Sequence, residues 1–174
     1  CALGQVVEDL LLSATMSAGA AARERVDLAE VATRVTADFA GLADAAGVTL
    51  RTDIAEGAAP VEVLGAAPAL RRALGALVDN ALDHQRPGGT VTVRLYRTAT
   101  GVAVDVRDDG VGVDPGGIDR LFERFAHGDH PGGRKRYGLG LALVREIAQA
   151  HGGNVSVAPT PGGGATFTLN FPGA

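Results

Sequence analysis

The chain has 174 residues and a formal net charge of −4 at pH 7, a length that suits about one domain with a single core. The acidic balance excludes general nucleic-acid binding, which needs a basic face to neutralise phosphates. One cysteine, at residue 1, excludes an internal disulfide and a cysteine metal cluster, and it predicts a reducing compartment. No run approaches the roughly 18 apolar residues of a membrane span. We therefore expect a soluble fragment that makes no contact with a membrane.

Residues 1–25 predict the end of a helix followed by a linker. Val6, Leu10 and Leu11 share one helical side, and residues 13–22 are mostly Ala, Ser and Gly. The domain proper is expected over residues 26–174. Asp27 predicts a helix N-cap, with Glu30 three residues later completing a capping box.

The rest of the chain alternates between strand-like and helix-like periods. Helices are expected from residue 28 to about 42, over about 70–81 and over about 141–148, and strands over about 48–54, 61–64, 91–95, 102–106, 154–158 and 165–171. Residues 109–137 are rich in Gly and Pro, which is typical of a long lid. The sequence therefore predicts a two-layer α/β sandwich, a mixed sheet of about five strands packed on about three helices.

Asp108 follows a predicted strand and stands before Gly110 and Gly112. A carboxylate only accepts hydrogen bonds, so at a strand end it suits the exocyclic amine of adenine, whereas guanine presents a carbonyl there. The glycines let the backbone run close to a flat base. An ordinary Asp-Gly turn is the competing interpretation.

Asn80 lies beside the apolar stripe of the predicted helix over about 70–81. An amide oxygen is a neutral ligand suited to Mg²⁺, which bridges to phosphate oxygens. The competing interpretation is an ordinary surface asparagine.

Gly138 and Gly140 open a predicted helix whose first backbone N–H groups would attract phosphate. Arg134, Lys135 and Arg136 precede them and offer cations for phosphate, or else form a solvated loop. Neither the dinucleotide fingerprint nor a P-loop is present.

Taken together, four segments resemble the ATP-binding catalytic domain of bacterial two-component sensor histidine kinases. This domain has the Bergerat fold, shared with type II topoisomerases, mismatch-repair ATPases and a heat-shock chaperone. The segments, which stand in the family's order, are Asp79–His84, like the asparagine box; Asp108–Gly112, like the first glycine box; Leu121–Phe125, like the phenylalanine box; and Gly138–Val144, like the second glycine box. The resemblance covers about residues 27–172.

The resemblance implies ATP and Mg²⁺ as cofactors. It makes Asn80 the Mg²⁺ ligand and Asp108 the adenine acceptor, and it puts Thr166 of the closing strand near the nucleotide. The full set of residues expected at the nucleotide is Asn80, His84, Asp108, Gly110, Gly112, Phe125, Arg134, Lys135, Arg136, Gly138, Leu139, Gly140, Leu141 and Thr166. No side chain is assigned as catalytic.

Two departures from the family pattern concern the phosphates. The family has Lys or Arg three residues after the box asparagine, and this chain has Asp83. Arg86 or the cations at 134–136 would have to substitute. Before the second glycine box, Arg136 and Tyr137 stand where Gly and Ser or Thr are usual.

Transfer to histidine is favoured over hydrolysis. Hydrolytic branches carry a Glu one helical turn before the box asparagine, and this chain has Ala76, which cannot take a proton from water. The family's acceptor histidine precedes an acidic residue, and none of the four histidines here does. The acceptor is therefore expected upstream, on a dimerisation domain that is a partner of this fragment.

The expected function is donation of the ATP γ-phosphoryl group to that histidine, the first step of a phosphorelay that continues to a response regulator. The expected location is cytoplasmic, within a parent protein anchored in the cell membrane. Two alternatives stay open: another ATPase or serine kinase of the superfamily, and a non-catalytic nucleotide-sensing scaffold.

Overall fold

The computed structural model describes residues 23–57, 61–110 and 140–173, together with Gly4, Val7, Leu10 and Leu11. The predicted linker over 13–22 and nearly all of the predicted lid lie outside these residues. Within them, the order of elements is the predicted one, with one additional strand at the start.

The main sheet is mixed and has five strands, as the sequence predicts. In spatial order the strands are β2 (Thr49–Ile54), β4 (Thr90–Arg97), β5 (Gly101–Asp108), β7 (Ala165–Pro172) and β6 (Asn154–Pro159). Only the β2–β4 pair is parallel; the others are antiparallel. The register sets Asp108 opposite Val91 and Arg107 opposite Thr166. The carboxyl end of β5 therefore lies between the first residues of β4 and β7.

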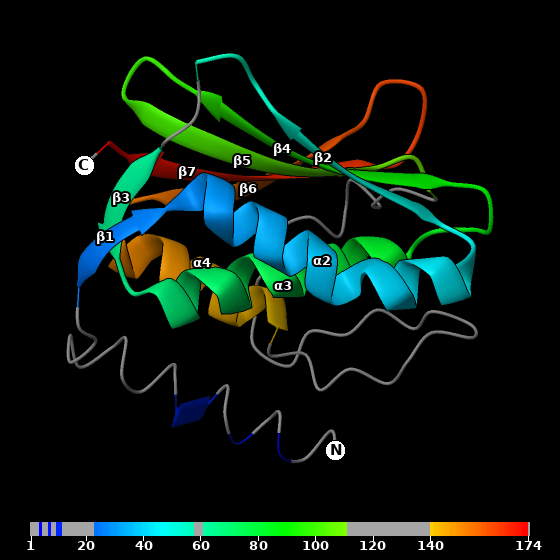
Figure 1. Cartoon of the computed structure of the whole chain (residues 1–174), viewed down its shortest axis with the longest axis horizontal. Helices are drawn as coiled ribbons and strands as arrows, with labels where there is room; N and C mark the ends of the chain where they lie inside the picture. Colours follow the sequence, from blue (N-terminus) through cyan, green and yellow to red (C-terminus); the bar gives the residue numbers. More distant parts are fainter. Residues whose placement is uncertain are drawn as a thin grey trace.

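Three helices cover one face of this sheet. They are α2 (Leu28–Ala46), α3 (Ala67–Asp83) and α4 (Gly140–Ala150), and Figure 1 shows them side by side beneath the strands. Leu77 and Val78 of α3 are fully buried, as are Val93 of β4 and Phe167 of β7. The core is thus a single aliphatic layer between helices and sheet, which is the predicted two-layer α/β sandwich.

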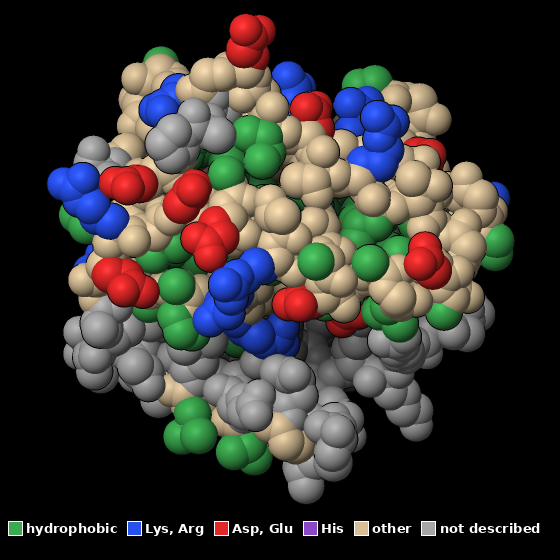
Figure 2. Space-filling view, in the orientation of Figure 1, with side chains coloured by type: hydrophobic (Ala, Val, Ile, Leu, Met, Phe, Trp, Pro, Cys, Tyr) green, Lys and Arg blue, Asp and Glu red, His purple; other side chains and the backbone are tan. Residues whose placement is uncertain are grey.

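The outer faces of both layers are polar. On the open side of the sheet, Tyr96 and Thr168 both donate hydrogen bonds to Asp105, at 3.1 and 2.8 Å. On the surface that Figure 2 shows, charges of both signs are interspersed. One such pair, Glu30 and Arg34, is spaced i,i+4 on α2 at 3.4 Å.

Helix α2 begins where the sequence predicts. Asp27 is the N-cap, and its carboxylate accepts a hydrogen bond from the N–H of Ala29 at 2.9 Å. The helix ends at Gly47, whose φ of 69° is left-handed.

A second, two-stranded sheet was not predicted in full. It pairs β1 (Glu24–Asp27) with β3 (Glu62–Gly65) in antiparallel register. Only β3 was expected, since the four residues of β1 include one apolar side chain, Val26. Its pairing with Val63 and its burial define the strand, and neither can be read from local periodicity.

Candidate nucleotide site

Asp108 ends β5 with its carboxyl group buried. The residue is only 2% exposed. Its Oδ1 atom accepts hydrogen bonds from the backbone N–H groups of Gly110, at 3.0 Å, and Ala165, at 3.2 Å. Within the described residues, Oδ2 receives no hydrogen bond. A buried oxygen without a donor is costly, so this site suits a ligand that brings an N–H group.

Burial raises the pKa of the Asp108 carboxyl above its ordinary value. The N–H groups of Gly110 and Ala165 oppose that rise, as does positive charge on His84, while the negative charge of Asp109 adds to it. Burial prevails. A further N–H donor at Oδ2 would favour the ionised form and relieve part of this cost.

The glycine turn before β7 packs directly on the backbone of Asp108. Gly164 has φ of +93°, and a Cβ atom there would lie 2.0 Å from the carbonyl oxygen of Asp108. The hydroxyl of Thr160 donates to the same carbonyl oxygen at 3.1 Å and lies 3.0 Å from the hydroxyl of Thr166. The side chain of Thr160 therefore connects the hydroxyl of Thr166 to the backbone of Asp108.

Asn80 lies in the last turns of α3 and is 8% exposed. No described residue forms a hydrogen bond with its side-chain amide. A buried amide in this condition has both a donor and an acceptor to offer a ligand. The oxygen is of the type that Mg²⁺ accepts, so the residue fits the metal role that the resemblance implies.

His84 caps the C-terminal end of α3. Its backbone N–H and its Nδ1 atom both lie against the carbonyl oxygen of Asn80, at 3.3 and 2.8 Å. A carbonyl can only accept, so Nδ1 carries the proton. This fixes the orientation of the half-buried imidazole.

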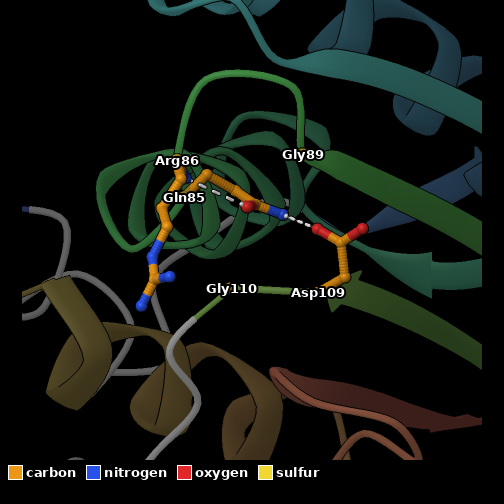
Figure 3. Close-up of a pocket in the computed structure, with 5 residues that line it drawn as sticks. All are labelled: Gln85, Arg86, Gly89, Asp109 and Gly110. Atoms are coloured by element: carbon orange, nitrogen blue, oxygen red, sulfur yellow. Dashed lines mark hydrogen bonds between the residues drawn. The ribbon is translucent and has the colours of Figure 1, made fainter.

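The end of α3 and the end of β5 meet at Gly110. A Cβ atom at Gly110 would lie 2.4 Å from the backbone oxygen of His84, so only glycine permits this approach. The structure thereby brings His84, the C-cap of α3 and one turn after Asn80, close to Asp108 at the end of β5. Next to this junction is an open pocket of about 200 Å³, lined by Gln85, Arg86, Gly89, Asp109 and Gly110 (Figure 3).

The remaining predicted residues divide into two groups. Gly140 and Leu141 begin α4, which packs along α3, and Leu141 contacts the core. The others lie outside the described residues: Gly112, Phe125, Arg134, Lys135, Arg136, Gly138 and Leu139.

Four residues at the junction are not among those expected at the nucleotide from the sequence. Thr160 and Gly164 hold the backbone of Asp108 in place, and Gln85 and Asp109 join α3 to β5. The run Gly162-Gly163-Gly164 was the available signal for the first pair. The second pair has no motif, because its contact joins residues 24 positions apart.

The family model described as "Histidine kinase-, DNA gyrase B-, and HSP90-like ATPase" matches residues 65–174, which include α3, β5 and the glycine turn. The chain belongs to this family. Its curated relatives include sensor kinases. The sensor-like histidine kinase SenX3 of Mycobacterium tuberculosis is 38% identical over 132 residues, which are 75% of this chain and 32% of SenX3.

Solved histidine kinase structures share the fold of this family member. The mycobacterial sensor histidine kinase MprB has 30% identity and a TM-score of 0.73, covering 87% of this chain and 98% of that one. Full-length ShkA, solved in complex with AMPPNP, has 28% identity and a TM-score of 0.82, covering 99% of this chain and 36% of ShkA. The domain is thus an ATP-binding domain of the histidine kinase type.

The chain spans about a third of the length of SenX3. In the part of the chain that the structure describes, no helix combines the length and the hydropathy that crossing a bilayer requires.

Proposed function

We propose that this domain binds Mg²⁺-ATP and donates the γ-phosphoryl group to a histidine on a dimerisation segment of the same sensor kinase. The observation that carries this proposal is the buried carboxyl of Asp108, whose Oδ2 atom has no donor among the described residues. The exocyclic amine of adenine is a matching donor. A guanine carbonyl would face a carboxylate, so ATP is the expected nucleotide.

Each residue of the junction has a part in the proposed site. Asp108 would hold adenine, with Gly110 and Gly164 allowing the backbone to come close to the base and to Asp108. Asn80 would hold Mg²⁺, which neutralises phosphate charge when bound. Thr166 and the residues at 134–136 and 138–141 are proposed for the nucleotide and its phosphates. Phosphoryl transfer depends mainly on positioning and charge neutralisation, and a binding site of this kind supplies both.

Two observations favour transfer over hydrolysis. Ala76 lies on α3 one turn before Asn80 and is buried, so a methyl group occupies the place where a general base would act on water. The second is the state of the described histidines. His84 is engaged at Nδ1, and both ring nitrogens of buried His151 are hydrogen-bonded, to Ile147 and Ala66. His151 therefore has no free ring nitrogen with which to accept a phosphoryl group.

The proposal extends to the organisation of the parent protein. Residues 1–25 would be the tail of the dimerisation helix and a linker, and residues 26–174 the catalytic domain with a lid at about 109–137. The parent would be anchored in the membrane with this domain in the cytoplasm, and it would pass the phosphoryl group to a response regulator.

The direct test uses the longer protein in which the dimerisation helix and its histidine precede this chain. With labelled ATP, we expect acid-labile, base-stable phosphate on that histidine and little release of free phosphate. Asp108→Ala should abolish the labelling, whereas Asp38→Ala, at an exposed carboxylate on α2, should not change it. Failure of the longer protein to acquire acid-labile phosphate would refute the transfer function.

A second candidate is a non-catalytic nucleotide sensor. It is favoured by Asp83, an acidic residue one turn beyond Asn80 on α3, where the family pattern has a cation. Equal affinity for adenosine and ATP would support the sensor. Tighter binding of ATP would support the kinase.

A further inference from the structure

Asp108 and Asp109 are neighbours with opposite environments. The carboxyl of Asp108 is buried beside Gly110 and Ala165, whereas that of Asp109 is exposed and faces the end of α3. Oδ1 of Asp109 accepts hydrogen bonds from the backbone N–H of Thr90, at 3.0 Å, and from Nε2 of Gln85, at 2.6 Å. These two donors lower the pKa of Asp109, with Thr90 contributing most. The Oδ1 atom of Asp109 is therefore committed to protein partners.

Both the nitrogen and the oxygen of the Gln85 amide are hydrogen-bonded. Its Nε2 group donates to Asp109 and, at 2.8 Å, to the backbone oxygen of Thr90. Its Oε1 atom accepts from the N–H of Arg86 at 3.2 Å. Figure 3 shows the Gln85 side chain reaching from the loop after α3 to Asp109 at the end of β5. One side chain thus connects the loop after α3, the first residue of β4 and the residue after β5.

This connection spans the two halves of the candidate site. Asn80 is on the α3 side, one turn before His84 and close to Gln85 in the chain. Asp108 is on the β5 side, directly before Asp109. The distance between the two ends therefore determines how far the Asn80 amide lies from the Asp108 carboxyl.

We propose that Gln85 and Asp109 are positioning residues, whose bridge sets the separation of Asn80 and Asp108 and so couples Mg²⁺ binding to adenine binding. This inference rests on the proposed function, because it assigns the metal to Asn80 and the base to Asp108. The proposal assigns neither Gln85 nor Asp109 a contact with the nucleotide, because they hydrogen-bond to each other and to Thr90. Their effect is on the geometry with which a single ligand meets both halves at once.

The bridge makes a specific prediction about which ligands respond to its loss. Adenosine would contact only the β5 side, at Asp108. Its affinity should therefore change less than about twofold when Gln85 or Asp109 is replaced by Ala. The Mg²⁺-dependent gain in ATP affinity requires Asn80 and Asp108 to be at the correct separation. It should fall about tenfold, the effect of losing one or two charge-assisted hydrogen bonds at close range.

The experiment measures adenosine and ATP affinity, with and without Mg²⁺, in Gln85→Ala, Asp109→Ala and the double variant. We expect the Mg²⁺-dependent gain to fall about tenfold in each single variant, and to fall no further in the double variant. Asp109→Asn keeps an oxygen that accepts from Thr90 and Gln85, so it should retain the gain within about threefold. Gln149→Ala, at an exposed glutamine of α4, is the matched control.

Thermal unfolding of each variant separates positioning from simple stability. A bridge that only stabilises the fold would weaken adenosine and ATP in parallel with the fall in Tm, and this result would overturn the inference. An unchanged Mg²⁺-dependent gain in Gln85→Ala would also overturn it, as would additive losses in the double variant. Absence of Mg²⁺-dependent ATP binding in the wild type would instead refute the proposed function, and with it the bridge's role.

Discussion

At the scale of single residues, the site depends on a carboxylate held where burial opposes its charge. Asp108 is almost fully enclosed, and among the described residues only two backbone N–H groups reach Oδ1. Burial raises the pKa of Asp108, so the unfolded chain releases the proton more readily than the folded one. The stability that this group contributes is present below its ordinary pKa of 3.8 and is lost as the pH rises through the higher folded value.

Replacing Asp108 by Asn should therefore separate stability from binding. The amide oxygen can accept from Gly110 and Ala165 without a buried charge, so the Tm of the ligand-free variant at pH 7 should equal or exceed that of wild type. The advantage should shrink as the pH falls towards 3.8. ATP affinity should fall by about 1–3 kcal/mol, because the amide N–H₂ opposes the adenine amine. Lower stability with unchanged ATP affinity, measured by thermal unfolding and calorimetry, would contradict this assignment.

The sequence predicts some of these residues and misses others for a physical reason. Asp108 follows a strand of alternating period and precedes glycines, so its place at a strand end could be inferred. Gly110 needs its glycine because His84 approaches it, and that contact is tertiary. Thr160 donates a hydrogen bond to the backbone of Asp108, 52 positions away in the chain. The run of three glycines after Thr160 indicated a turn but not this contact.

At the scale of elements, the helices were predictable because each carries a strong apolar stripe, and the pairing of strands was not. The parallel β2–β4 pair and the position of β7 between β5 and β6 arise from packing of the whole sheet.

The contacts of His151 were likewise not predictable from the sequence. This residue follows α4, and its ring accepts the N–H of Ala66 at 3.1 Å while donating to the Ile147 oxygen at 2.7 Å.

His151 should make the α4–β3 junction sensitive to acid. Burial lowers the pKa of His151 from 6.5, the Ile147 oxygen opposes this, and the charge of Arg23 adds to it. The unfolded chain therefore takes up the proton first, so stability from the neutral ring is present above pH 6.5 and is lost as the pH falls below it. In His151→Gln, which keeps an acceptor for Ala66, Tm should fall less between pH 7.5 and 5.5 than in wild type. Equal slopes in the two proteins would contradict this account.

At the scale of the whole molecule, the candidate site lies at one edge of the two-layer architecture. The last turn of α3, the carboxyl end of β5 and the glycine turn before β7 converge there, although they lie far apart in the chain. The resemblance stated from four ordered segments foresaw the family, which the match over residues 65–174 confirms. The individual roles of the site residues are still predictions, and those at 111–139 lie outside the described residues.

The central claim is that Asp108 holds adenine and Asn80 holds Mg²⁺ in one ATP site. Calorimetry with ATP, in the presence and absence of Mg²⁺, tests it in wild type, Asp108→Ala and Asn80→Ala, with Asp38→Ala and Gln149→Ala as surface controls. We predict that Asp108→Ala loses binding under both conditions and that Asn80→Ala loses only the Mg²⁺-dependent part. Wild-type protein that binds no ATP, or an Asp108→Ala variant that binds as tightly as wild type, would contradict the account.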